Sequence, residues 1–484
     1  MQLPFMSRVC VSRLLRCRGS RDTHTDARSP IFSLRGEIRI PVPPKSLTRL
    51  QQVAMKVIII CLGTRGDVEP LLALGKALLA RGHAVTLCGP DNCEKWVRDE
   101  HGVAFAPMGL DFKVLMQSPE VRGARGGGVE SAIGKLVCAA MPAALRAASG
   151  CAAAGGVDLV VCSCSFPGGP DLAEAHGAAL VTAALAPVFP TRSFPFFLAS
   201  AVAPLRCLNR ATYMMPAMAR TMHGAALAQW RRETLRLPAR APTVLEMGCR
   251  TDGSVAPRMC CVSPTVIARP DDWDDKTFMT GYWRLDDPAQ WQPGADLAAF
   301  LAGAGAQPVV YIGFGSMTAL APAALAAIVL PAVRDAGVRA VLQLGWSGAA
   351  AADAAAAADP NVFYLDAAPH AKLFPLVAAV VHHGGAGTTA AGLAAGRPTL
   401  VCPIGADQHM WAAIVHRKLG CGPPPVALAR LTPTLLAARL RALVADAGFR
   451  ARAEALAAEI AKEDGLARAV EVVEMEGRRC GKMP

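Results

Sequence analysis

From Met55 onward, short runs of apolar, β-branched residues alternate with longer stretches rich in Ala and Leu. The runs predict buried strands at 56–62, 83–88, 158–164 and 179–184, and the stretches predict helices at 70–81 and 92–101. Strands that are apolar on both faces and separated by helices are typical of a parallel sheet covered on both sides. The pattern therefore predicts a Rossmann-like domain over residues 55–265.

The alternation stops in a stretch rich in Pro, Asp and Trp, which we interpret as an interdomain connection over residues 266–307. It then resumes, with strands predicted at 309–314, 340–344, 362–365, 377–381 and 399–403, and helices at 322–336 and 390–395. This predicts a second Rossmann-like domain over residues 308–432. Residues 433–484 are expected to be helical and to pack back on the first domain. The predicted fold class is α/β, with two Rossmann-like domains facing across a cleft at their strand ends.

The positive charge of the chain is concentrated in its first 54 residues. The whole chain carries a formal charge of +12, of which residues 1–54 hold +7. The remaining 430 residues are only weakly basic, so we expect no nucleic-acid partner. We interpret residues 1–54 as a disordered extension or as the product of an upstream start, with Met55 as the natural first residue. An organelle-targeting peptide is the alternative.

The cysteines and the apolar segments indicate whether the protein binds a metal, where in the cell it works and whether it spans a membrane. The 16 cysteines include no CxxC pair and match no zinc framework, and several lie inside predicted strands. We therefore expect no metal and a reducing, cytoplasmic location. No apolar run reaches the ~18 residues of a membrane span. The apolar patch from Phe194 to Leu205 leaves a peripheral membrane contact open.

The strongest candidate site is the sequence HHGGAGTT, which follows the predicted strand at 377–381. It comprises His382, His383, Gly384, Gly385, Gly387, Thr388 and Thr389. Glycines allow a diphosphate to approach the backbone, and amides at a helix start attract anions. His382 is placed to donate a hydrogen bond to a diphosphate oxygen. The alternative for a single histidine at this position is a structural role.

Polar residues also end two neighbouring strands of the second domain. Asp407 and Gln408 follow the strand at 399–403 and suit the hydroxyls of a sugar, with a solvated loop as the alternative. Gly315 and Ser316 close the strand at 309–314, where they suit a phosphate or a ribose. Together these residues predict a nucleotide-sugar site.

A further turn follows the first strand of the first domain, with the residues Gly63, Thr64, Arg65, Gly66 and Asp67. Its spacing is not that of a dinucleotide-binding or Walker motif. At the rim of the cleft, Asp67 is placed to accept a proton from an alcohol. The alternative is a carboxylate that caps the following helix.

In this order, the motifs resemble the GT-B glycosyltransferases, and specifically the family of sterol glucosyltransferases and glycopeptide-antibiotic glycosyltransferases. The resemblance covers about residues 55–425. It rests on LGTRGDVEP (62–70), TGYW (280–283), YIGFGSM (311–317), APHAKLFP (368–375), HHGGAGTTAAGLAAGRPTLVCP (382–403) and ADQ (406–408). Ala406 stands where the family often has glycine.

The resemblance implies an inverting transfer of a hexose, first of all glucose, from a UDP-sugar to a small lipophilic alcohol. Asp67 would be the general base, and His382 would stabilise the diphosphate leaving group. Asp407 and Gln408 would hold the sugar, and Ser316 and His370 would lie near the phosphate and base. No cofactor or metal is expected. A catalytically degenerate protein that binds a nucleotide sugar is the alternative, and the acceptor and the oligomeric state stay open.

Overall fold

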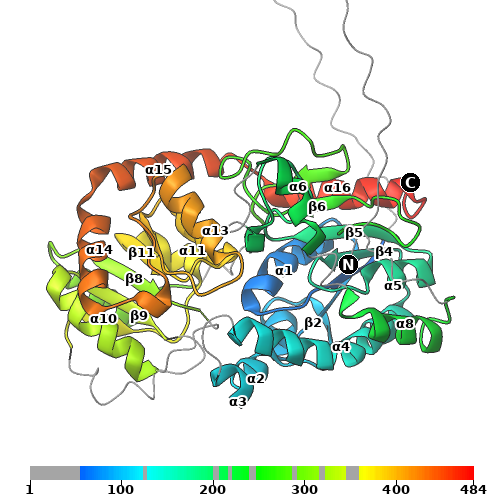
Figure 1. The fold of residues 1–484 in the computed structure, drawn as a ribbon, viewed down its shortest axis with the longest axis horizontal. Helices are drawn as coiled ribbons and strands as arrows, with labels where there is room; N and C mark the ends of the chain where they lie inside the picture. Colours follow the sequence, from blue (N-terminus) through cyan, green and yellow to red (C-terminus); the bar gives the residue numbers. More distant parts are fainter. Residues whose placement is uncertain are drawn as a thin grey trace, which may run out of the picture. The chain divides into compact units, whose positions relative to one another are not determined.

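The computed structural model describes residues 55–123, 128–199, 206–215, 221–238, 247–285, 291–315, 322–344 and 359–484. Residues 1–54 and Ser316, for which the sequence suggests roles, are not among the described residues. The described residues form two parallel sheets, each with helices packed against it (Figure 1).

The first sheet has seven parallel strands in the order β3-β2-β1-β4-β5-β6-β7. The strands are β1 (Lys56–Ile60), β2 (Ala84–Gly89), β3 (Ala104–Pro107), β4 (Leu159–Ser163), β5 (Ala179–Ala184), β6 (Arg258–Cys260) and β7 (Thr277–Met279). The last of these lies inside the stretch expected to be an interdomain connection, and it pairs with β6. Three-residue strands are too short to show a periodic pattern, so the sequence did not indicate β6 or β7.

The alternation of side chains along β1 explains how helices cover both faces of this sheet. Val57 and Ile59 pack on one side with α1 (Arg65–Ala80) and α16 (Gly465–Arg479). Ile58 and Ile60 point to the other side, where α4 (Gly128–Gly155) packs. Successive residues of a strand face opposite sides, so an unbroken apolar run requires cover on both.

No uninterrupted apolar run reaches the length of a membrane span, but one helix passes a test of length and mean hydropathy that tolerates two charged residues. Within the described residues, Ser131–Gly155 of α4 meets both conditions. Lys135 and Arg146 interrupt the apolar run without lowering the mean hydropathy of this alanine-rich helix below that of a membrane span. Leu145 and Ala148 of the same helix are buried against the first sheet.

The second sheet has five parallel strands in the order β10-β9-β8-β11-β12. They are β8 (Val309–Gly313), β9 (Arg339–Gln343), β10 (Val362–Tyr364), β11 (Ala379–His382) and β12 (Thr399–Val401). The helices of this part are α9 (Ala295–Ala302), α10 (Pro322–Ala336), α11 (His370–Leu373), α12 (Ala386–Ala394), α13 (Gln408–Ala413) and α14 (Pro433–Ala445). Both sheets carry their polar turns at the carboxyl ends of their strands, where the candidate residues lie.

The C-terminal helices contact both halves of the chain. After α14, helix α15 (Ala447–Ile460) packs on α12, and α16 packs on α1 and β5 of the first sheet. The side chain of Glu476 on α16 is fully buried and bonded to Arg250 and Arg479. The last helix therefore belongs to the core of the first sheet.

Candidate functional site

The turn after β1 places Asp67 in the first turn of a helix. Helix α1 begins at Arg65, five residues before the predicted start, because Pro70 is tolerated inside the helix. Asp67 Oδ2 accepts hydrogen bonds from the backbone N–H of Thr64 (2.7 Å) and from its hydroxyl (3.2 Å). The capping role that the sequence left as an alternative is therefore present, and it fixes the carboxylate at the end of the strand.

Gly63 makes room for this carboxylate. Its φ is +144°, which side chains rarely adopt, and a Cβ at this position would overlap the carboxylate of Asp67. Any side chain here would both strain the backbone and displace Asp67.

The environment of Asp67 suits a base that works near neutral pH. Burial raises the pKa of Asp67 to about 6, although the hydrogen bonds from Thr64 act in the opposite direction. The negative charge of Asp407 is a smaller contribution to the same upward shift of this pKa. A carboxylate with such a pKa is mostly ionised at pH 7 and still accepts a proton readily.

Asp407 lies in the second half of the chain and faces the same region. It precedes α13, and its Oδ2 accepts a hydrogen bond from Trp411 Nε1 (2.7 Å). Burial raises the pKa of Asp407 as well. The starts of α1 and α12 also meet, since a Cβ on Gly387 would lie 3.9 Å from the carbonyl oxygen of Gly66. The structure therefore brings together turns that are more than 300 residues apart in the sequence.

Gln408 orders the loop in front of α13. Its side chain is 2% exposed, and its Oε1 accepts hydrogen bonds from the backbone N–H groups of Ile404 (2.7 Å) and Gly405 (3.2 Å). Just before it, Ala406 has a φ of +51°, a left-handed conformation that favours glycine. The contacts of Asp407 and Gln408 with a sugar stay predictions.

His382, the last residue of β11, is fully buried. Its Nδ1 accepts a hydrogen bond from the backbone N–H of Gly384 (2.9 Å), so the ring proton is on Nε2. Burial holds the pKa of His382 well below its ordinary value, and the ring is therefore neutral. Nε2 is buried and has no partner among the described residues. The contact of this histidine with a diphosphate stays a prediction.

His383 is half-buried and lies between two strand-end turns. A Cβ on Gly315 (φ +65°) would lie 2.6 Å from its Cε1, and a Cβ on Gly385 would lie 2.7 Å from its Nε2. The ring thus fits only because both neighbours are glycines. Burial lowers the pKa of His383 to about 4. Of the two histidines, His383 is the more accessible to a ligand, a distinction that the sequence did not make.

Helix α12 begins at Ala386, so the predicted Gly/Thr turn is its first turn. The backbone N–H and the hydroxyl of Thr389 both donate to the carbonyl of Gly385, at 2.9 Å. Both donors of Thr389 are therefore engaged within the helix, because it is the first residue with a helical partner four positions back, and its contact with a ligand stays a prediction. Gly387 and Thr388 precede it, and amides in this first part of a helix have no helical acceptor.

His370 begins α11 on the same side of the second sheet. Its Nε2 lies 3.2 Å from the hydroxyl of Tyr311, and its ring stacks on Phe374 with centroids 4.5 Å apart. The pKa of His370 is lowered to about 4, mainly by burial and to a smaller extent by the charges of His383 and Arg65. The sequence did not indicate Tyr311, although its place at the start of YIGFGSM, on the strand that leads into the site, was an available signal.

Among the described residues, no group of three or more His, Cys, Asp or Glu side chains is arranged to hold a metal ion. The predicted absence of a metal stays a prediction.

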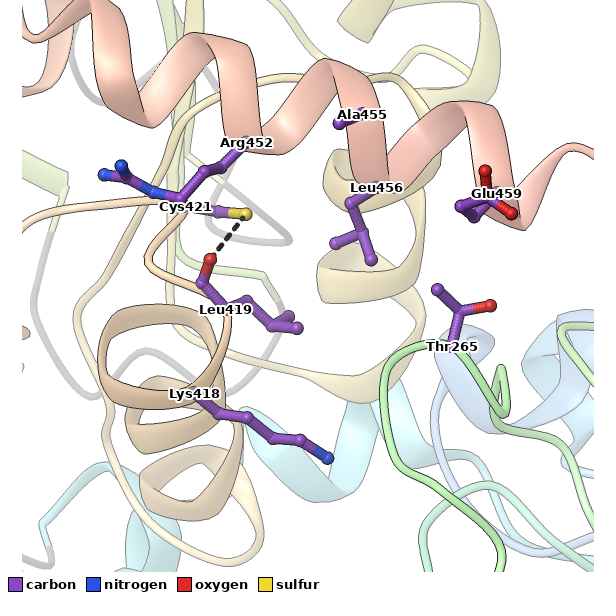
Figure 2. A pocket seen from close by; sticks show the side chains of 8 residues that line it. All are labelled: Thr265, Lys418, Leu419, Cys421, Arg452, Ala455, Leu456 and Glu459. Carbon is purple, nitrogen blue, oxygen red and sulfur yellow. Dashed lines mark hydrogen bonds between the residues drawn. The ribbon is translucent and has the colours of Figure 1, made fainter.

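A separate cavity of about 340 Å³ is lined by none of the predicted residues (Figure 2). It is lined by Thr265, Lys418, Leu419, Cys421, Arg452, Ala455, Leu456 and Glu459. Thr265 also donates its hydroxyl to Glu463 (2.8 Å), in the segment that joins α15 to α16. This cavity therefore marks the crossing between the two halves of the chain and lacks the carboxylate pair of the candidate site.

Comparisons with known proteins match the two halves separately. The Glycosyltransferase family 28 N-terminal domain matches residues 57–195, and the Erythromycin biosynthesis protein CIII-like C-terminal domain matches residues 346–475. Among solved structures, the glycosyltransferase SnogD from Streptomyces nogalater has a TM-score of 0.60 at 23% identity. The match covers 88% of this chain and 100% of the SnogD chain. The glycotransferase of kitacinnamycin has a TM-score of 0.64 at 18% identity, with coverage of 87% and 99%.

The chain has the GT-B fold of these glycosyltransferases. The predicted fold class, with two Rossmann-like domains, is confirmed. The chain is also 32% identical over 430 residues to a Sterol 3-beta-glucosyltransferase of Aspergillus clavatus, and 33% identical over 450 residues to one of Cryptococcus neoformans. Each match covers 87% of this chain, but this chain spans only 30% and 27% of the length of those relatives.

Proposed function

We propose that this GT-B protein is an inverting hexosyltransferase that moves glucose from UDP-glucose to the hydroxyl group of a lipophilic acceptor of the sterol class. The observation that carries the proposal is that the turn after β1, which holds Asp67, meets the first turn of α12, while the charge of Asp407, in the loop after β12, acts on Asp67. One turn supplies a base for an alcohol, and the other supplies polar groups for a sugar.

In the proposed reaction the acceptor oxygen attacks the anomeric carbon of the glucose. Asp67 accepts the hydroxyl proton, and the bond from the anomeric carbon to the diphosphate breaks with its electron pair remaining on the diphosphate. A base with a pKa of about 6 meets the need for a carboxylate that is ionised at neutral pH. The first-turn amides of α12 and the imidazole of His383 face the charge that develops on the leaving group. The reaction needs no cofactor in this scheme.

The surroundings of Asp67 support a lipophilic acceptor. The thiol of Cys164 lies within electrostatic reach of both carboxylates, and burial raises its pKa to about 12. Cys164 packs in one apolar cluster with the half-buried rings of Phe194 and Phe197. A poorly hydrated wall of this kind favours the hydrocarbon body of an alcohol over a free sugar. The names of the sterol glucosyltransferases among the relatives point in the same direction.

A surface beside this wall supports transient contact with a membrane by a cytoplasmic protein. Leu198, Met214 and Met215 are between 42% and 57% exposed. The two segments that carry them pack together, because the ring of Phe196 contacts both Phe197 and Tyr213. An exposed apolar patch next to an acceptor site would give access to alcohols dissolved in lipid.

The test is an acceptor screen with purified protein, in which products are identified by mass spectrometry. UDP-glucose, UDP-galactose and TDP-sugars are each offered with sterols, other lipophilic alcohols and free sugars. We expect a sterol that gains one hexose from UDP-glucose. Tight binding of UDP without transfer to any acceptor and without hydrolysis of the donor would instead support the degenerate binding protein.

A further inference from the structure

Arg65 is a cation at the edge of the candidate site, held by one ring contact and one long ion pair. Its guanidinium lies over the ring of Trp96, 4.3 Å from the centroid, and its Nε is 3.5 Å from Glu69 Oε2. The side chains of Arg65 and Glu69 are 54% and 46% exposed. Ion pairs between such exposed groups contribute little, so the stacking on Trp96 is the stronger restraint.

Arg65 belongs to the first sheet, but its charge reaches the second. It is the first residue of α1, and the adjacent Gly66 faces Gly387 in the first turn of α12. The same charge lowers the pKa of His370, on α11 of the second sheet. Arg65 therefore lies in the turn of the first sheet that meets the start of α12, and its charge acts on His370 of the second sheet.

The groups around this region share a preference for an anion. The N-termini of α1 and α12 both carry partial positive charge, and they converge at Gly66 and Gly387. His382 Nε2 is fully buried, carries the ring proton and has no partner among the described residues. Two carboxylates are also near, but Asp67 and Asp407 each already accept hydrogen bonds from their own turn or helix.

We propose that Arg65 is a catalytic residue that the acceptor domain contributes to the donor site, where its guanidinium binds the diphosphate of the nucleotide sugar. This rests on the function proposed above and deepens it. When the bond between the anomeric carbon and the diphosphate breaks, the electron pair stays on the diphosphate oxygen. The guanidinium of Arg65 stabilises the negative charge that this adds. The acceptor proton goes to Asp67, two residues further along the same helix turn.

The planar shape of the guanidinium matters in this role. Trp96 supports one face of it, which leaves the N–H groups at its edge for two phosphate oxygens. A lysine could supply the charge but neither the stacking nor the paired hydrogen bonds. The acceptor and the donor would then be held by one turn, since Arg65 and Asp67 both lie in the first turn of α1.

The experiment compares Arg65→Ala and Arg65→Lys with Arg98→Ala as a matched control. Arg98 is 53% exposed and pairs with Glu94 four residues away, as Arg65 does with Glu69. Binding of UDP alone is measured by calorimetry, and kcat and KM are measured for UDP-glucose with the acceptor found in the screen. For Arg65→Ala we expect about 10-fold weaker UDP binding and about 100-fold lower kcat, with the acceptor KM within about twofold of the parent.

Arg65→Lys should recover part of the UDP affinity but little of kcat, and Arg98→Ala should match the parent in all values. Unchanged UDP affinity and unchanged kcat in Arg65→Ala would overturn the proposal, as would equal losses in Arg98→Ala. Thermal melting of each variant shows whether it is folded. If Arg65→Ala does not fold, the comparison is made with Arg65→Lys alone. A parent protein that neither binds UDP nor transfers glucose would refute the proposed function itself.

Discussion

The turns after β1 and after β11 have the same local design but opposite chemistry. Each joins a buried parallel strand to a helix through a glycine with positive φ, Gly63 in the first and Gly384 in the second. In the first turn a carboxylate, Asp67, accepts hydrogen bonds from the residue that precedes the helix. In the second turn the side chains are neutral imidazoles and the helix start has no acidic cap.

This difference shows that the side chains of the turn, and not its backbone, decide what the helix start can bind. An acidic residue in the first turn places a negative charge at the helix start and is available as a base. A first turn without one leaves its amides for an external anion.

The largest effect is expected for Asp67→Asn. The amide oxygen still accepts from Thr64, so the turn keeps its shape, but the residue can no longer take up the acceptor proton. We expect transfer to fall by about 10²- to 10⁴-fold, as for other general bases, with the affinity for UDP within about twofold of the parent. Steady-state kinetics and calorimetry check this. Loss of UDP binding with near-normal transfer would show that Asp67 serves the donor and is not the base.

Of the two histidines of the second turn, His383 should contribute more to UDP binding and His382 more to stability. We expect His383→Ala to weaken UDP binding by about 10-fold with little change in thermal stability, because its ring is only half-buried. His382→Ala should lower the melting temperature, because it empties a fully buried position and removes the acceptor of the Gly384 amide.

Calorimetric UDP binding and thermal melting of both variants make this comparison. His382→Asn is the control, since its side chain retains an acceptor near the position of Nδ1. A loss of stability confined to His383→Ala, with UDP affinity lost only in His382→Ala, would reverse the assignment.

The smallest effect is expected for Ala406→Gly, in the loop before Asp407. Ala406 has a φ of +51°, and a left-handed conformation costs a non-glycine residue about 1–2 kcal/mol. Glycine also increases the freedom of the unfolded chain, so the net gain in unfolding free energy should be about 1 kcal/mol or less. Thermal melting checks the direction. A lower melting temperature would mean that the contacts of the Ala406 methyl group outweigh the backbone strain.

The sequence predicted much of the fold because long apolar runs have few alternatives. The strand at Ala179–Ala184 and the helix at Pro322–Ala336 have the predicted bounds. It did not predict β6, β7 or the helix α4, since three-residue strands lack a period and the alanine-rich α4 lacks a clear polar face. Short elements of this kind are fixed by their neighbours in space.

At the site, the sequence identified the two turns but not which side chains within them are buried and which are accessible to a ligand. Consecutive residues such as His382 and His383 have the same chemistry, and only the packing decides which is covered. Thr389 was assigned to a ligand, although its position in the helix commits its donors to the carbonyl four residues back. The coupling of Asp67 to Asp407 depends on how the two sheets meet, which periodicity does not report.

The most direct test of the account is the pH dependence of kcat/KM for the parent and for Asp407→Asn. The base must be ionised, so the rate of the parent should fall as the pH drops below about 6, the pKa of Asp67. Asp407 raises that pKa, so its replacement by Asn should move this acid limb to lower pH, whatever it does to the maximal rate. An acid limb at the same pH in both proteins would contradict the claim that the two turns form one site.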